Sequence, residues 1–237
     1  MLANRRVKIV ATIGPSTRDR GNLRKIIESG VNVVRLNFSH GKHEEHLEVI
    51  RQVREMAREL QAPVALLQDL QGPKIRVGRF KSGSTELIPG KLVTFDPQLG
   101  EGDGDQIPTD FAELPQVVKP ETRILLDDGL MEVVVQEVKG QKVIAKVVYG
   151  GTLKDRKGMN LPGVALPVEC LTEKDLDDLE FGLANKVDYV ALSFVRRGQD
   201  IRKLRELVEE RTPGTRIIAK IEMLEALDNL EEIISLS

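Results

Sequence analysis

The feature that most constrains the fold of this chain is a change of pattern along its length. Up to about residue 70, short β-branched runs alternate with amphipathic helical stretches. From residue 75 to residue 167 there are only short β-rich runs separated by turns, and the alternation resumes near Thr172. Because repeated βα units build a parallel sheet or a barrel, we expect an α/β domain that is interrupted by a separate all-β module.

Roughly five strands are expected in the α/β part, each from a short apolar run. These runs cover residues 8–14, 31–39, 63–70, 187–195 and 216–222. The clearest helix between them is residues 43–60, with an apolar stripe made by Leu47, Ile50, Val53, Ala57 and Leu60. Thr172 and Asp175 have the spacing of a capping box and predict a helix start. A last helix, from about residue 224, is expected to bury Leu227, Leu230, Ile233 and Ile234.

The expected fold is an incomplete (β/α)₈ barrel of the TIM type. Such a barrel needs eight strands, and roughly five are present. An open, doubly wound five-stranded sheet is the alternative, but a β module after the third strand and polar strand ends favour the barrel. The predicted domains are 1–73 for the first barrel segment, 74–168 for an inserted β-barrel lid and 169–237 for a second, truncated barrel segment.

Composition excludes several classes of partner. The net charge of −2 leaves no basic surplus to neutralise a nucleic acid or an anionic membrane. No apolar run approaches the length that spans a membrane. A single cysteine, Cys170, excludes an internal disulfide framework and fits a reducing cytoplasm. We therefore expect a cytoplasmic protein that binds no nucleic acid and no membrane.

Polar side chains occupy every other position in the second half of the second expected strand. Arg35, Asn37 and Ser39 alternate with apolar residues and therefore project to one side. A guanidinium, an amide and a hydroxyl at the end of a barrel strand can hold phosphoryl oxygens. The alternative interpretation is a structural arginine that pairs with a carboxylate.

The fifth expected strand ends with Lys220 and Glu222 on one side. A lysine there can stabilise negative charge on a transferring phosphoryl group or an enolate, and a glutamate can hold a divalent cation. A structural salt bridge, an aldolase or an enolate-forming lyase would show the same pair. Lys74 and Arg76 follow a Gly-Pro turn at the entry to the β module, which is either a functional hinge or a solvated loop.

A series of longer motifs resembles the pyruvate kinase family. In the order of that family, the motifs are TIGPS (12–16), NVVRLNFSHG (32–41), QDLQGPKIR (68–76), LLDDG (125–129), KGMNLPG (157–163), LTEKDLDDLEFG (171–182), ALSFVR (191–196) and AKIE (219–222). They cover essentially the whole chain. The resemblance implies transfer of a phosphoryl group from phosphoenolpyruvate to ADP, which gives pyruvate and ATP in glycolysis.

The resemblance also implies roles for individual residues. Lys220 and Arg35 would be catalytic, and Glu222 would ligate Mg²⁺ or Mn²⁺. The substrate phosphate and monovalent-cation region would comprise Arg35, Asn37, Ser39, Asp69, Leu70 and Lys74. The nucleotide would be bound by Pro15, Asn37, His40, Arg76, Asp128 and Lys157. Ser193 and Phe194 would stand near the catalytic lysine.

One departure from the family pattern predicts independence from K⁺. Many pyruvate kinases have Thr-Lys-Gly-Pro-Glu where this chain has Leu-Gln-Gly-Pro-Lys at residues 70–74, and a threonine or similar residue where this chain has Val77. The change at Leu70 removes a hydroxyl ligand, and Lys74 adds a fixed positive charge with three donors. We expect Lys74 to replace the monovalent cation; the alternative is a surface lysine at a degenerate site.

The family's barrel continues beyond residue 237 to a second carboxylate ligand of the metal. We therefore expect these 237 residues alone to be inactive and the full-length enzyme to be a homo-oligomer, a tetramer. A non-catalytic phosphometabolite-binding or partner-completing fragment is the alternative function.

Overall fold

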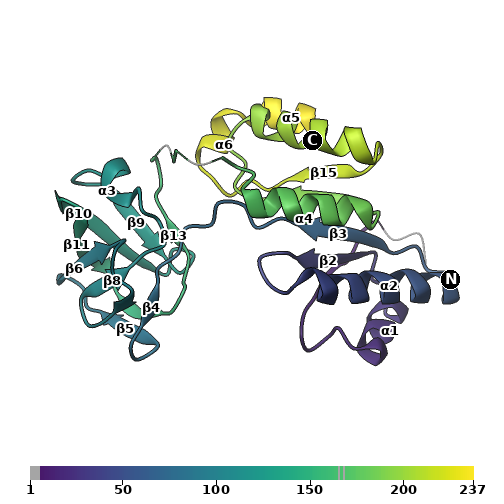
Figure 1. Cartoon of the computed structure of the whole chain (residues 1–237), viewed down its shortest axis with the longest axis horizontal. Helices are drawn as coiled ribbons and strands as arrows, with labels where there is room; N and C mark the ends of the chain where they lie inside the picture. Colours follow the sequence, from purple (N-terminus) through teal and green to yellow (C-terminus); the bar gives the residue numbers. More distant parts are fainter. Residues whose placement is uncertain (1–5, 165, 168) are drawn as a thin grey trace. The chain divides into compact units, whose positions relative to one another are not determined.

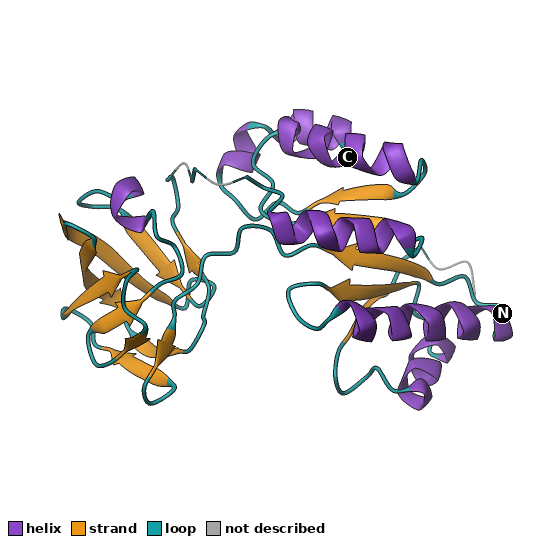
Figure 2. Ribbon diagram, in the orientation of Figure 1, coloured by secondary structure: helices purple, strands orange, loops and turns teal. Residues whose placement is uncertain are grey.

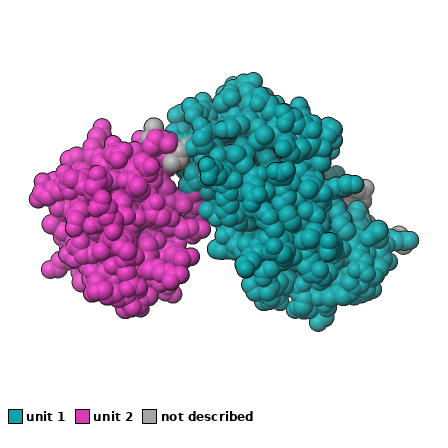
Figure 3. Space-filling model, viewed as in Figure 1, with its two compact units in different colours: residues 1–73, 169–237 teal, residues 74–168 magenta. Residues whose placement is uncertain are grey.

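The chain forms two compact units. The computed structural model describes residues 6–164, 166–167 and 169–237. One unit comprises residues 1–73 and 169–237, and the other comprises residues 74–168 (Figure 3). Each unit has its own cluster of buried apolar side chains. We call them the barrel unit and the inserted unit.

The barrel unit is built on a five-stranded parallel sheet (Figure 1). Its strands follow one another in chain order: β1 (Val10–Ile13), β2 (Val33–Asn37), β3 (Ala65–Asp69), β14 (Tyr189–Leu192) and β15 (Arg216–Ala219). A doubly wound sheet instead reverses its strand order at a switch point. The sheet therefore has the consecutive order of an α/β barrel, and the doubly wound alternative is wrong.

Helices connect or follow these strands and cover the sheet (Figure 2). In the described part of the barrel unit they are α1 (Arg20–Glu28), α2 (His43–Glu59), α4 (Glu173–Ala184), α5 (Gly198–Arg211), α6 (Glu225–Asp228) and α7 (Leu230–Leu236). The predicted capping box is confirmed, because the hydroxyl of Thr172 accepts from the backbone N–H of Asp175. The core between sheet and helices includes Leu23, Met56, Leu66 and Val190, all of which are fully buried.

The prediction for the last helix is wrong in two respects. The segment is broken at Asn229, whose amide donates to the carbonyls of Glu225 and Arg196 and so separates α6 from α7. The break changes which face packs inward. Ile233 is buried as expected, but Leu227 and Ile234 are exposed.

The inserted unit is almost entirely β-structure. Its largest sheet has six strands in the order β13-β9-β10-β11-β6-β8, and β12-β5 and β4-β7 form two small sheets. The strands are β4 (Arg79–Phe80), β5 (Ser84–Leu87), β6 (Leu92–Asp96), β7 (Glu101–Gly102), β8 (Gln106–Pro108), β9 (Arg123–Leu126), β10 (Met131–Lys139), β11 (Lys142–Tyr149), β12 (Gly151–Lys154) and β13 (Met159–Asn160). Two antiparallel hairpins, β9–β10 and β10–β11, are joined through the turns at Asp128-Gly129 and Lys139-Gly140. One short helix, α3 (Leu114–Val117), was not expected from the sequence.

Candidate active site

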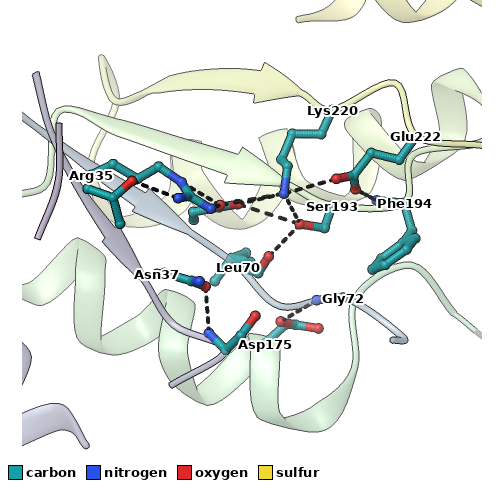
Figure 4. Close-up of polar contacts among 12 residues, drawn as sticks. Arg35, Asn37, Leu70, Gly72, Asp175, Ser193, Phe194, Lys220 and Glu222 are labelled. Carbon is teal, nitrogen blue, oxygen red and sulfur yellow. Dashed lines mark hydrogen bonds and ion pairs between the residues drawn. The ribbon is translucent and has the colours of Figure 1, made fainter. Parts of the chain in front are cut away.

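Four strands of the barrel unit bring charged or polar side chains together at or near their carboxyl ends. Arg35 lies on β2, Asp69 ends β3, Ser193 follows β14, and Lys220 and Glu222 follow β15 (Figure 4). The parallel register places Asp69 between Asn37 and Ala191, and pairs Leu192 with Ala219. The carboxyl ends of barrel strands are where active sites are built.

Asp69 is a buried carboxylate shared by two cations. Its side chain is 3% exposed. Arg35 donates to it through Nε at 2.8 Å and through Nη2, and Lys220 Nζ lies 3.2 Å from its Oδ1. Arg35 also donates to the hydroxyl of Thr12 at 2.8 Å. The alternative of a structural Arg–carboxylate pair therefore describes part of what is seen, but the same carboxylate also holds Lys220.

Three acceptors surround the ammonium of Lys220. They are Asp69, Ser193 Oγ at 2.8 Å and Glu222 Oε1 at 3.3 Å. Ser193 is buried and donates its own hydroxyl hydrogen to the carbonyl of Leu70 at 2.7 Å, so it faces the lysine as an acceptor. The Lys220 side chain is 29% exposed, which leaves the ammonium accessible to a substrate.

Glu222 is the most accessible carboxylate of this group. Its side chain is 37% exposed, and Oε2 accepts from the backbone N–H of Phe194 at 3.0 Å. Phe194 has a φ of +57°, a left-handed conformation that is costly for a residue of this size. Because carboxylate oxygens are the ligands that Mg²⁺ and Mn²⁺ prefer, Glu222 fits the role of one metal ligand.

The structure groups only part of the predicted phosphate cradle. Arg35 joins Asp69 and Lys220, as described above. Asn37 Oδ1 instead accepts from the backbone N–H of Ser39 at 3.1 Å, which fixes the turn after β2. Leu70 contributes its carbonyl to Ser193, and its side chain is buried.

The predicted nucleotide residues fall into one set on each unit. Pro15, Asn37 and His40 line a cavity of about 530 Å³ on the barrel unit. His46 also lines this cavity, stacks on Phe38 at 4.1 Å between ring centroids and contacts the carbonyl of His40 at 2.9 Å. Burial lowers the pKa of His46 below its usual value.

On the inserted unit, Arg76 donates to the carbonyl of Arg156 at 3.2 Å, and Lys157 pairs with Asp127 at 2.8 Å. Asp127 and Asp128 both have positive φ, in the turn between β9 and β10. The side chain of Lys74 lies close to Gly158, because a Cβ added at Gly158 would be 3.3 Å from Cε of Lys74. These residues form a second polar cluster, within the inserted unit.

Sequence reasoning missed one further group. Three possible metal-ligand atoms, one each from His43, Asp177 and Asp178, lie within 4.8 Å of one another. Asp178 is already engaged, because His43 Nε2 lies 2.7 Å from one of its oxygens and Lys174 pairs with the other. His43 is on α2, whereas Asp177 and Asp178 are on α4. Because these helices are far apart in the sequence, no local pattern indicated the group.

Comparison with known proteins shows which proteins this chain is similar to. A family model for the pyruvate kinase barrel domain matches residues 4–237. A pyruvate kinase of Agrobacterium vitis is 45% identical over 236 residues, which is 99% of this chain and 48% of the relative. Pyruvate kinase 2 of Synechocystis is 45% identical over 97% of this chain and 40% of the relative. Pyruvate kinase II of Salmonella typhimurium is 45% identical over 94% of this chain and 47% of the relative.

The chain thus spans about half the length of these curated relatives or less. The match to a barrel-domain model and the consecutive parallel strands confirm the prediction of an incomplete α/β barrel. No helix in the described residues is long and apolar enough to cross a membrane. From the family model and the relatives together, the chain belongs to the pyruvate kinase family.

Proposed function

We propose that this chain supplies the phosphoryl-handling site of an enzyme that transfers phosphate from phosphoenolpyruvate to ADP. The observation that carries the proposal is the pairing of Arg35 and Lys220 on one buried carboxylate, Asp69, beside the accessible Glu222. A lone salt bridge would not bring two cations and an exposed carboxylate to the carboxyl ends of adjacent barrel strands. The resulting product would be pyruvate, in glycolysis.

In the proposed reaction, the bond between phosphorus and the enol oxygen breaks and a bond to a terminal oxygen of ADP forms. Negative charge then lies on the transferring phosphoryl group and on the enolate that is left. Lys220 would stabilise both, because its ammonium is held in one position by Asp69, Ser193 and Glu222 before substrate binds. The enolate finally takes up a proton to give pyruvate. Arg35 would hold phosphoryl oxygens through its planar guanidinium.

A divalent cation, Mg²⁺ or Mn²⁺, fits the charge of this site. The cluster contains two cationic and two carboxylate side chains, so it has no surplus charge to balance the phosphate and carboxylate groups of phosphoenolpyruvate. Glu222 would hold the cation, which supplies positive charge at the oxygens of the substrate when it is bound. Mg²⁺ commonly uses only one or two protein carboxylates and completes its shell with water and substrate oxygens.

For the nucleotide, the proposed ligands are the two sets described above. Pro15, Asn37 and His40 line the cavity of the barrel unit, and Arg76, Asp128 and Lys157 lie in the polar cluster of the inserted unit. Arginine and lysine are the side chains best suited to the phosphates of ADP or ATP.

We also propose that the enzyme does not require K⁺. The oxygens that could hold a monovalent cation already accept hydrogen bonds from side chains of this chain. Arg35 and Lys220 donate to Asp69, and Ser193 donates to the carbonyl of Leu70. Lys74 would supply the remaining positive charge. These bonds support the proposal, because a cation would have to displace them.

The proposed setting is the cytoplasm, and the proposed assembly of the full-length enzyme is a tetramer. The other carboxylate of this cluster, Asp69, is buried and paired with Arg35 and Lys220, which leaves Glu222 as the accessible carboxylate among the described residues of the cluster. We therefore expect these 237 residues alone to bind phosphoenolpyruvate weakly and not to turn it over.

The test of the proposed site is calorimetric titration of this chain with phosphoenolpyruvate in the presence of Mn²⁺. We expect saturable binding that Lys220→Gln weakens about tenfold or more, since it removes one charge-assisted contact to the phosphate. Lys203→Gln is the control, because Lys203 forms an exposed pair with Glu169 outside this cluster. Equal binding by wild type and Lys220→Gln would rule out the proposed role of Lys220. Binding with no turnover in any longer version of the protein would favour the alternative of a non-catalytic phosphometabolite-binding module.

A further inference from the structure

A single buried carboxylate lies where the chain leaves the barrel unit and where it returns. The side chain of Asp175 is on the first turn of α4, and the residue is fully buried. Its Oδ1 accepts from the backbone N–H of Gly72 at 3.0 Å, in the segment that leaves β3 (Figure 4). Its Oδ2 accepts from the N–H of Thr172 at 3.0 Å and from the hydroxyl of Thr172 at 2.6 Å, in the segment that returns.

The two segments are the connections to the inserted unit. The boundaries between the units fall after Pro73 and before Glu169, so each bonded residue lies within three residues of a boundary. An ordinary capping box would satisfy only the N-terminus of its own helix. Here Oδ1 of Asp175 instead accepts a hydrogen bond from Gly72, which lies more than one hundred positions away in the sequence.

The outgoing connection is packed tightly where Asp175 holds it. Gly72 has a φ of +68°, and a Cβ at this position would lie 2.8 Å from Cδ2 of Phe194 and 3.2 Å from Cβ of Ser193. The turn therefore has little room to shift at Gly72. The returning connection is held a second time, because the thiol of Cys170 donates to the carbonyl of Ser193 at 3.2 Å.

We propose that Asp175 is a positioning residue that anchors both connections of the inserted unit at one point of the barrel unit. Loss of this carboxylate frees Gly72 and Thr172 together, so that both connections lose their bond to α4 at once. The anchor stands independently of any reaction. Any effect on catalysis rests on the proposed function, in which Arg76, Asp128 and Lys157 of the inserted unit bind ADP.

The experiment compares Asp175→Ala with Asp200→Ala. Asp200 is the matched control, because it occupies the same cap position on α5 and accepts from the N–H groups of Arg196 and Arg197 at 2.9 and 3.2 Å. It has no bond to either connection in the described hydrogen bonds. Both variants remove a cap carboxylate, but only the first removes the bond to Gly72.

Two readouts need no substrate. The first is amide hydrogen exchange at Gly72, which we expect to be protected at least about a hundredfold in the wild-type chain although it lies in a turn. Asp175→Ala should accelerate it at least about tenfold, while amides in the centre of β3 stay unchanged. The second is the reaction of Cys170, the only cysteine of the chain, with an aromatic disulfide reagent. Burial raises the pKa of this thiol to about 12, and the nearby charges of Asp200 and Asp175 add to the rise, so wild type should react slowly. Loss of either charge favours the thiolate, but only Asp175→Ala also frees the connection, so Asp175→Ala should react faster than Asp200→Ala.

An unprotected Gly72 amide in the wild-type chain would overturn the proposal, even if Asp175→Ala failed to fold. Equal acceleration in Asp200→Ala would also overturn it, because a general loss of stability would then explain the change. A protected Gly72 in wild type, together with no binding of ADP by a full-length version, would keep the anchor and reject the proposed function instead.

Discussion

At the scale of single residues, the sequence located the charged side chains but not their partners. Arg35 was recognisable as a charged residue within an apolar strand, and Lys220 and Glu222 as charged residues at the end of one. Their sharing of Asp69 and Ser193 depends on which strands are neighbours, and on the register that sets Ala191 against Asp69. Neither is a property of a local pattern, so the bridging role of Asp69 could not be read from the residues, and only the family resemblance indicated that Ser193 lies near Lys220.

One prediction for a single residue concerns Lys74. We define the joined protein as this chain continued by the remaining C-terminal part of the Agrobacterium vitis relative. If Lys74 replaces a monovalent cation, activity of the joined protein should not change when K⁺ replaces tetramethylammonium at constant ionic strength. Lys74→Glu should lower the activity, and K⁺ should restore it only when Leu70→Thr is added. A many-fold rise of wild-type activity with K⁺ would refute the prediction.

A second prediction at this scale concerns pH. Burial lowers the pKa of His46 in the folded chain, so the unfolded chain binds the proton more tightly. The stabilisation from a neutral His46 is therefore complete above its unfolded pKa of about 6.5 and is lost as the pH falls through the lower folded value. Urea unfolding at pH 7.5 and pH 5.5 should show a smaller loss of stability for His46→Gln than for wild type. Equal losses would contradict this assignment.

At the scale of elements, strands and helices were predictable where one face is clearly apolar. The helix expected over residues 43–60 is observed as α2 (His43–Glu59), because four of its residues form a buried stripe. The end of the chain was less predictable. Leu227 and Ile234 look apolar enough to be buried, but the side-chain bonds of Asn229 turn the helix before the expected stripe is complete.

The contact between β3 and α4 gives a prediction for Gly182. A Cβ on this residue would lie 2.0 Å from Oε1 of Gln68, which is buried without a hydrogen-bond partner, while Nε2 of Gln68 donates to the carbonyl of Asp178. Helix propensity alone would make Gly182→Ala stabilising. We expect it instead to destabilise the chain by about 1–3 kcal/mol, because the core would be overpacked.

Denaturant unfolding measures this change in free energy. In the background of Gln68→Ala, which opens space beside Gly182, the cost of Gly182→Ala should be smaller. Equal costs in both backgrounds would show that the contact with Gln68 does not require glycine at this position.

At the scale of the whole molecule, the sequence patterns and the structure divide the chain at similar places. The change from βα units to β-rich runs near residue 74 reflects two different ways of building a core, and each unit has its own buried cluster. Strand order could not be read from the pattern, because both barrels and doubly wound sheets repeat βα units. The consecutive order of five parallel strands settled that choice.

The central claim is that Lys220 acts on a phosphoryl group in transfer to ADP. The most direct measurement is pyruvate formation from phosphoenolpyruvate and ADP by the joined protein and by its Lys220→Gln variant, with Mg²⁺ present and folding checked by circular dichroism. We expect turnover by the joined protein and a loss of about a hundredfold or more in the variant, since one fixed donor at the developing charge is removed. Equal turnover by the two folded proteins would contradict it.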